Sequence, residues 1–290
     1  MSPAEHLLRA SAPYDGPRLL SFLGVHAVPG VEYWNGATYT RSLQTPAGPA
    51  VVGLTAAPDG ITVSGDVSAA VLRRLEHLLA TTSTTTAAER ALARDALLGP
   101  LVGARPGLRP PGSIDDGEIL VRTVVGQQVS LAGARAVLGR MCADLGEPLP
   151  AQLSRPGVTR LFPTMAALAA CDPLQLPMPR SRARAVVACA GAVAQDGALP
   201  EREQLLALPG VGPWTTDYVD LRCRRDPDVF LPTDLAVRRV LEQSGLAATP
   251  RAATALAAGW APYRSTALIH LWTAYLEPET EPPTEPAIPL

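Results

Sequence analysis

Asp234 is the acidic residue whose place in the chain best suits chemistry. Residues 229–233 read VFLPT and residues 235–240 read LAVRRV, which predicts a helix capped by Thr233 with Asp234 in its first turn. The dipole of that helix favours a negative charge at its N-terminus. A carboxylate fixed there can stabilise a cationic transition state, although taken alone ordinary capping is the commoner role of such a residue.

A glycine-containing turn upstream of Asp234 suits phosphate binding. Residues 206–218 read LALPGVGPWTTDY, which predicts a helix ending near Leu208, a tight turn that needs both Gly210 and Gly212, and a second helix from Pro213. Backbone N–H groups exposed at such a helix start bind an anion, most often a phosphate. Contacts of this kind position a duplex without reading its sequence. A plain turn between two helices is the alternative.

The basic residues narrow the possible chemistry. All 25 are Arg and the chain contains no Lys, so a Schiff-base mechanism, which usually needs a Lys amine, has no nucleophile except the N-terminus. The net charge is −2, but residues 101–276 carry 18 Arg against 15 acidic residues. A mildly basic part of this kind can bind phosphates if its arginines share one face.

Other compositional features exclude whole classes of site. The four cysteines, Cys142, Cys171, Cys189 and Cys223, form no CxxC pair, so neither a zinc site nor an iron–sulfur cluster has its usual ligand spacing. They are interpreted as reduced thiols of a cytoplasmic protein. No secretory signal pattern and no apolar run of membrane-spanning length is found, so no membrane partner is expected. Nothing indicates an interface, so we expect a monomer without an obligate protein partner.

The elements that must position these residues fall into two parts of the chain, one with strands and helices and one that is helical. Strands are predicted at 39–43, 50–54 and 61–67, with a hairpin signal at Asp59-Gly60, and helices at 17–23 and 69–75. Residues 81–86 read as a loop or a helix start. Beyond them the pattern is helical, with segments at 87–98, 114–125, 130–145, 164–170, 181–195, 202–207, 214–224, 234–243, 251–258 and 264–276.

These patterns predict an α+β fold: a small antiparallel sheet with helices, followed by an all-helical part. The expected boundaries are 1–86 for the N-terminal domain, 87–276 for the helical domain with its hairpin at about 202–224, and 277–290 for a tail. Residues 103–112, which read GARPGLRPPG, are expected to be a connector. The tail holds five Pro and four Glu and is expected to be disordered.

The motifs together resemble a known family. The hairpin with Gly-Val-Gly and the downstream Asp234 resemble the helix-hairpin-helix DNA glycosylase superfamily. Within it, residues up to about 276 look like the bacterial DNA-3-methyladenine glycosylase II family. The resemblance rests on these further stretches: PYD at 13–15, YTRSL at 39–43, ARPGLR at 104–109, VGQQVS at 125–130, FLPTD at 230–234 and YRSTAL at 263–268.

The resemblance implies a fold and an active site. The N-terminal domain should be TBP-like, and the helical core should consist of two subdomains with the pocket between them. Asp234 matches the catalytic aspartate of the family, and the base pocket is implied to contain Phe22, Trp214, Tyr218 and Trp272. Trp214 and Tyr218 lie four residues apart and so share a helix face. Each of these rings could instead belong to the core.

The resemblance also implies a double-stranded DNA partner. The DNA contacts are implied to involve Gly210, Val211, Gly212, Thr215, Gln127, Gln128, Arg264 and Ser265. Gln128 stands where a family member can insert an apolar wedge, although Gln127 and Gln128 could instead bridge helices. No cofactor is expected beyond a Na⁺ or K⁺ ion, which would be held by the backbone carbonyls of Leu206, Leu208 and Val211.

The activity that the resemblance implies is hydrolytic excision of alkylated bases in base excision repair. Bases such as 3-methyladenine and 7-methylguanine carry positive charge, which an aromatic pocket attracts. Relatives that also cleave the strand carry a Lys where this chain has Trp214, so no lyase activity is expected. The alternatives are a non-enzymatic DNA-binding module, a bifunctional lyase, and a small-molecule hydrolase pairing Asp234 with His6, His26, His77 or His270; the last has no supporting nucleophile motif.

Overall fold

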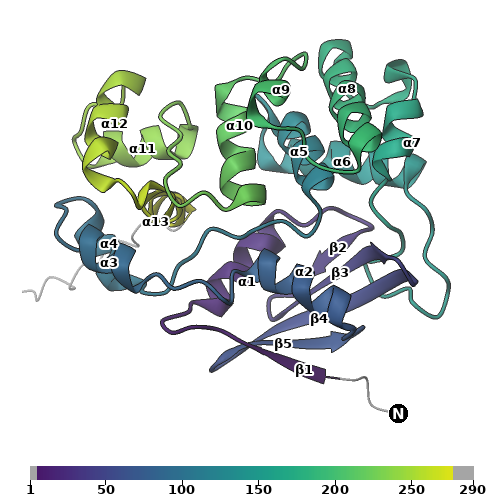
Figure 1. Cartoon of the computed structure of the whole chain (residues 1–290), viewed down its shortest axis with the longest axis horizontal. Helices are drawn as coiled ribbons and strands as arrows, with labels where there is room; N and C mark the ends of the chain where they lie inside the picture. The colour runs from purple at the N-terminus through teal and green to yellow at the C-terminus, as the bar shows by residue number, and fades with distance from the viewer. Residues whose placement is uncertain (1–4, 277–290) are drawn as a thin grey trace, which may run out of the picture.

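The computed structural model describes residues 5–276, so the expected disordered tail lies outside the described residues. A sheet forms one layer of the molecule, and two groups of helices stand above it (Figure 1). This agrees with the expected α+β class. Among residues 5–276, no helix combines the length and apolar character that crossing a membrane requires.

The sheet is antiparallel throughout, with strand order β1-β5-β4-β3-β2. Its strands are β1 Glu5–Arg9, β2 Glu32–Trp34, β3 Thr38–Thr45, β4 Gly48–Ala57 and β5 Gly60–Gly65. The three central strands are those that alternation predicts, and Asp59-Gly60 connects β4 to β5 as expected. The edge strands β1 and β2 were not predicted, because five and three residues carry too little alternation to distinguish from a loop.

Two helices, α1 (Gly16–Val25) and α2 (Ala69–Leu79), cover the sheet on the side that faces the rest of the molecule (Figure 1). Their apolar faces pack on the sheet, where Leu20, Leu54, Ile61 and Leu75 have no exposed surface. The layer therefore has its own hydrophobic core.

The remaining helices follow the expected segments closely. They are α3 Thr86–Leu92, α4 Leu98–Ala104, α5 Asp116–Gly126, α6 Leu131–Leu145, α7 Met165–Ala170, α8 Arg180–Asp196, α9 Arg202–Leu206, α10 Pro213–Val219, α11 Leu235–Gln243, α12 Pro250–Ala257 and α13 Arg264–Leu276. A π-helical turn at Asp220–Arg224 continues α10.

One predicted helix, 87–98, is in fact two. α3 ends at Leu92, and the Asp95 carboxylate accepts hydrogen bonds from the backbone N–H groups of Leu97 and Leu98 at 2.9 Å each. These bonds cap a new helix, α4, which extends to Ala104 and so into the expected connector. A short side chain that caps the following turn is a local competitor of helix continuation.

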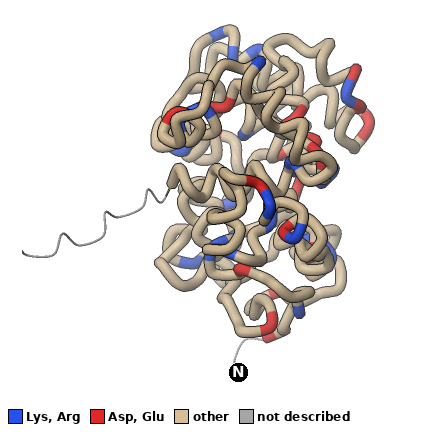
Figure 2. Tube along the Cα trace, turned by 90° about the vertical axis from the view of Figure 1, so that its left-hand side faces the viewer, with Lys and Arg blue, Asp and Glu red and all other residues tan. Residues whose placement is uncertain are grey.

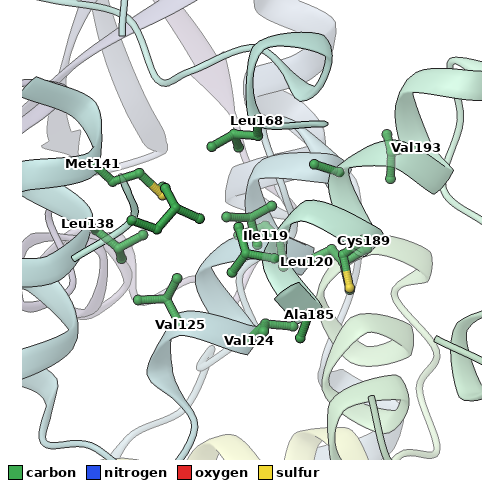
Figure 3. Close-up of a cluster of buried hydrophobic side chains, with 14 of the residues drawn as sticks. Ile119, Leu120, Val124, Val125, Leu138, Met141, Leu168, Ala185, Cys189 and Val193 are labelled. Carbon is green, nitrogen blue, oxygen red and sulfur yellow. The ribbon is translucent and has the colours of Figure 1, made fainter. Parts of the chain in front are cut away.

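The helices enclose two further hydrophobic cores. One joins α5, α6, α7 and α8 around Leu120, Val124, Met141 and Leu168 (Figure 3). The other joins α4, α11, α12 and α13. In Figure 1, α10 stands between these two groups, and its Tyr218 packs against both cores. Sequence order is thus not spatial order, because α4 lies beside α13.

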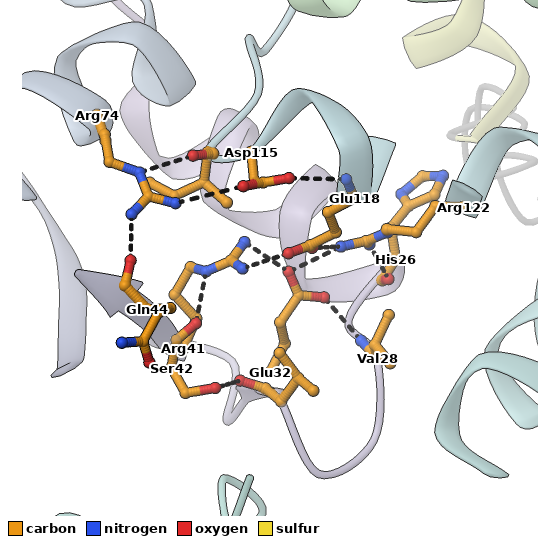
Figure 4. A network of polar contacts seen from close by, with 12 residues as sticks. His26, Val28, Glu32, Arg41, Ser42, Gln44, Arg74, Asp115, Glu118 and Arg122 are labelled. Carbon is orange, nitrogen blue, oxygen red and sulfur yellow. Dashed lines mark hydrogen bonds and ion pairs between the residues drawn. The ribbon is translucent and has the colours of Figure 1, made fainter. Parts of the chain in front are cut away.

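A buried ionic network ties the sheet to α5 (Figure 4). Arg41 of β3 bonds Glu32 of β2 at 3.0 Å and Glu118 of α5 at 2.9 Å, and Arg122 of α5 bonds the same two carboxylates at 3.0 and 2.8 Å. Burial alone would raise the pKa of Glu32, but the two guanidinium groups and the Tyr39 hydroxyl bring it down to about 2. The network therefore holds Glu32 ionised although its side chain is buried.

Candidate active site

Asp234 is itself the N-cap of α11, so the expectation that Thr233 caps this helix is wrong. Its Oδ1 atom accepts hydrogen bonds from Ala236 N at 3.0 Å, Val237 N at 3.2 Å and Trp272 Nε1 at 3.1 Å. Among residues 5–276 no hydrogen-bond partner is found for Oδ2. One oxygen thus fixes the carboxylate, and the other is left to the cavity that Asp234 lines.

Five rings form a continuous series along this cavity. Trp214 stacks on Tyr218 with centroids 5.4 Å apart, and Tyr218 meets Trp272 at 6.0 Å. Trp272 lies 6.4 Å from Phe22, which stacks on His26 at 4.3 Å. The four aromatic residues expected in the pocket therefore come together with Asp234, although they come from α1, α10 and α13. His26 was not expected there.

The cavity has a volume of about 540 Å³, which lies within the range of small-molecule sites. It opens where α1, α5, α6, α10, α11 and α13 meet. Phe22 packs against both the sheet core and the α11–α13 core, and Tyr218 packs against both helical cores. The site is thus a junction of three cores.

Arg222 is a second cavity residue that the sequence did not indicate. It is buried, with Nε bonded to Pro111 O at 2.7 Å and Nη2 to Gly112 O at 3.0 Å, and Nη1 donates to the Tyr218 hydroxyl at 2.7 Å. Its guanidinium carbon lies 5.8 Å from the Phe22 ring centroid and 5.6 Å from that of Tyr218. The π-helical turn places it, and no motif accompanies such a turn.

The charge of Arg222 qualifies the expectation that the rings attract a cationic base. A guanidinium already contacts two of these rings, so part of their attraction for a second cation is offset by repulsion. The unpaired oxygen of Asp234 and the ring of Trp214, which Arg222 does not contact, are the groups that favour positive charge.

The hairpin turn differs from its expectation in one respect. Gly210 has φ +74°, and a Cβ there would lie 2.9 Å from that of Ala185, so this position requires glycine. Gly212 has extended backbone and a Cβ there would meet nothing within 4 Å. Two glycines are therefore not both needed by the turn. Gly212 has no internal reason to lack a side chain, which fits close approach by an external group.

Comparisons with known proteins identify the family of this chain. A family model described as the AlkA N-terminal domain matches residues 6–115. DNA-3-methyladenine glycosylase 2 of Escherichia coli is 34% identical over 296 residues, covering 92% of this chain and 96% of that protein. This chain belongs to the DNA-3-methyladenine glycosylase 2 family.

Other family members and solved structures place this chain more broadly. A Mycobacterium tuberculosis protein named as a probable bifunctional transcriptional activator/DNA repair enzyme AlkA is 36% identical over 294 residues, or 96% of this chain, but the match spans only 58% of that protein. A 3-methyladenine DNA-glycosylase from Archaeoglobus fulgidus has TM-score 0.76 at 19% identity, covering 94% of this chain and 98% of its own. An 8-oxoguanine glycosylase/lyase from Clostridium acetobutylicum has TM-score 0.66 at 13% identity, covering 86% and 98%. The two structural likenesses show the fold alone.

The loop after α5 places the two predicted glutamines differently. Gln127 Nε2 donates to Gly210 O and to Thr215 Oγ1, each at 2.9 Å, so its amide braces the hairpin from within. Gln128 is exposed and has φ +56°, a conformation that non-glycine residues seldom adopt. Only the second side chain is therefore presented outward in this family member.

Two further predicted DNA contacts lie inside the protein. Thr215 is buried and its hydroxyl accepts from Gln127. Ser265 is 3% exposed, and its hydroxyl accepts from Val229 N and donates to Asp226 O. These side chains position the hairpin and the loop before α11 rather than reaching a ligand. Arg264 is partly exposed and paired with Asp228 at 2.7 Å.

The hairpin carbonyls differ in their surroundings. Leu206 ends α9 and is exposed, Leu208 O accepts from Val211 N at 3.2 Å, and Val211 is buried. Side chains that could bind a metal ion do not cluster in the described part of the protein: residues 5–276 contain no group of three or more His, Cys, Asp or Glu that could hold one.

The four cysteines are unpaired thiols.

Charges of both signs are interspersed along the trace in the view of Figure 2. This view shows no broad face of one sign.

Proposed function

We propose that this protein is a monofunctional DNA glycosylase of base excision repair that flips alkylated purines such as 3-methyladenine and 7-methylguanine out of double-stranded DNA and excises them. It acts as a monomer in the cytoplasm. The observation that carries the proposal is Asp234: a carboxylate with one oxygen held by three hydrogen bonds and the other open to an aromatic cavity.

The chemistry follows from this arrangement. A flipped base enters among the rings, at a cost of a few kcal/mol for unstacking. As the C1′–N bond breaks, the bonding electrons leave with the base and the sugar becomes oxocarbenium-like. Oδ2 of Asp234 stabilises that positive charge and orients the attacking water, whose proton passes to the solvent as the new C1′–O bond forms. A cationic leaving base requires no general acid.

The DNA grip is proposed for the hairpin and the loop after α5. The backbone N–H groups at the start of α10 bind a phosphate, and Gly212 allows its close approach. The carbonyls of Leu206, Leu208 and Val211 are proposed to hold a monovalent cation that screens this phosphate. The exposed Gln128 is proposed to occupy the gap left by the flipped base.

The absence of Lys from the chain supports hydrolysis without strand cleavage. A Schiff base with the abasic sugar would be trapped by borohydride, so the proposal predicts no covalent protein–DNA product under those conditions. Trapping of the wild-type protein would contradict the monofunctional assignment.

The direct test uses duplex DNA treated with a methylating agent, from which released bases are separated by chromatography. Wild type should release 3-methyladenine and 7-methylguanine. Asp234→Asn keeps an oxygen acceptor for the helix cap but removes the charge, so the single-turnover rate should fall on the order of 10²–10³-fold with DNA affinity preserved.

Asp172→Asn is the matched control, because Asp172 caps an exposed turn by accepting from Leu174 N and does not line the cavity. Its rate should equal that of wild type. Binding to DNA without release of any base by the wild-type protein would favour the non-enzymatic DNA-binding module.

A further inference from the structure

His26 is a cavity residue for which the proposed mechanism has no use. It follows α1, and its ring stacks on Phe22 with centroids 4.3 Å apart and planes 30° apart. Phe22 in turn stacks on Trp272, whose indole holds Asp234. The imidazole thus lies at the end of the ring series that would surround a flipped base. Figure 4 shows it pointing away from the buried ionic network.

The hydrogen bond of His26 determines which nitrogen carries the proton. Nδ1 lies 2.7 Å from the backbone carbonyl of Phe22, and a carbonyl oxygen can only accept, so Nδ1 carries the hydrogen. Burial, together with the charges of the nearby Arg222 and Arg122, lowers the pKa of His26 to about 4. At neutral pH the ring is therefore uncharged, and Nε2 is a bare acceptor.

No group of the described protein satisfies that acceptor. Nε2 has no hydrogen-bond partner among residues 5–276, and it is not closed off in the protein interior, because His26 lines the cavity. Of the arginines that line the cavity near His26, Arg222 donates to Pro111 O, Gly112 O and the Tyr218 hydroxyl, and Arg122 donates to the backbone carbonyl of His26 itself. An N–H group of a ligand in the cavity can therefore donate to this nitrogen.

We propose that His26 determines which lesions this site accepts, because its Nε2 accepts a hydrogen bond from an N–H group on the edge of the flipped base. This inference rests on the proposed function. It predicts selection for purines that keep such a hydrogen: the exocyclic amine of 3-methyladenine, the N1–H and amine of 7-methylguanine, and the N1–H of hypoxanthine. Ethenoadenine has its N1 and exocyclic nitrogen closed into a ring and offers no N–H there.

The physical basis is the penalty for an unpaired polar group. A cavity that hydrogen-bonds a substrate N–H discriminates against an analogue that lacks it, because the protein acceptor loses its hydrogen bond to water and gains none from the analogue. One such bond is expected to be worth about tenfold in rate.

Two substitutions separate the acceptor from the ring. His26→Asn can keep the donor to Phe22 O at the position of Nδ1 but has no atom at Nε2. His26→Gln is longer and can place its amide oxygen there. Both lose the stacked ring, so a difference between them reports the acceptor.

The experiment measures the single-turnover rate of base release from duplexes containing 7-methylguanine or ethenoadenine, for wild type and both variants. We expect His26→Asn to lose about tenfold on 7-methylguanine and less than about threefold on ethenoadenine, and His26→Gln to restore most of the difference. Equal losses on both lesions, or equal behaviour of the two variants, would overturn the proposal and assign His26 to packing of Phe22.

Binding of the free bases 3-methyladenine and ethenoadenine, followed by quenching of tryptophan fluorescence, distinguishes failure of this inference from failure of the proposed function. A preference for 3-methyladenine that His26→Asn abolishes would support the inference even if no base were excised. Excision by wild type with an unchanged lesion ratio in His26→Asn would leave the function standing and refute the role of His26. Neither excision nor base binding would refute both.

Discussion

At the scale of single residues, the site is an aspartate whose two oxygens have different tasks. Oδ1 accepts hydrogen bonds from two backbone N–H groups of α11 and from the indole of Trp272 on α13. These three bonds fix the carboxylate and therefore also the position of Oδ2. A charge-assisted hydrogen bond of this kind is worth roughly 1.5–3 kcal/mol. Its loss should therefore be visible in catalysis.

Trp272→Phe tests this positioning. The ring remains but the bond to Oδ1 is lost, so kcat for base release should fall about tenfold or more while KM changes little. Trp260→Phe is the matched control, because Trp260 Nε1 donates to Asp95 at 2.8 Å in an equivalent pair outside the cavity. That variant should lose stability and keep its kcat; an equal loss of kcat in both would show that Trp272 acts only through the fold.

Two histidines with lowered pKa values, His26 and His270, make folding sensitive to mild acid. Burial lowers the pKa values of His26 and His270 to about 4 each, from 6.5 in the unfolded chain. Between pH 4 and pH 6.5 these histidines are protonated in the unfolded chain but neutral in the folded chain. Their contribution to the unfolding free energy is therefore complete above about pH 6.5 and is lost as pH falls to about 4, by about 1.4 kcal/mol per pH unit for each histidine.

Urea unfolding between pH 7 and 4.5 measures this slope. His270→Gln should reduce the slope of unfolding free energy against pH by about the contribution of one histidine, whatever its effect on stability at pH 7. His6→Gln should leave the slope unchanged, because His6 is exposed. An unchanged slope in His270→Gln would contradict the assignment.

At the scale of elements, the hairpin combines a glycine that the turn requires with one that it does not. Gly210 adopts φ +74°, whereas the extended Gly212 faces open space. Gln127 ties the end of α5 to this turn. Two hydrogen bonds from Gln127 therefore hold the turn and the first residues of α10 in place.

Gly212→Ala should leave the folded protein intact and weaken DNA binding by several-fold to about tenfold, because a methyl group would obstruct a phosphate. Fluorescence anisotropy with an undamaged duplex measures the affinity, and thermal unfolding checks the fold. Gly103→Ala is the control, since a Cβ there also meets nothing within 4 Å but lies on α4. Equal affinities for the two variants would remove the hairpin from the DNA interface.

At the scale of the whole molecule, the cavity exists only because three cores meet. The ionic network of Glu32, Arg41, Glu118 and Arg122 joins two of the parts, and these side chains are buried or nearly so. Such a network need not add net stability relative to apolar residues, but removing one member leaves buried charges without partners.

Arg41→Met should therefore lower the unfolding free energy by about 3–5 kcal/mol. Denaturant titration measures it, with Arg239→Met as the control: Arg239 pairs with Glu242 on the surface of α11, so a change within about 0.5–1 kcal/mol is expected. Comparable losses in the two variants would show that the network contributes no more than a surface pair.

Much of this protein was predictable from local sequence. Helices α5 to α13 and strands β3 to β5 follow from hydrophobic periodicity, which is imposed by burying one face of each element. The hairpin was predictable from its glycines and Pro213, and Asp234 from its place at a helix start. Thr233 was misread as the cap of α11 because competing caps one residue apart differ only in backbone geometry, which the sequence does not reveal.

The tertiary structure alone decided what surrounds Asp234. Phe22, Tyr218 and Trp272 come from three distant helices, so their place in the pocket was expected from the family resemblance and not from any local spacing. Arg222 and His26 carried no motif; a π-helical turn and a stack on Phe22 bring them into the cavity. Periodicity is a property of one element and its buried face, so the sequence determined the elements and their hairpin by itself. The composition of a cavity depends on how three cores pack together, and only the folded chain determines that.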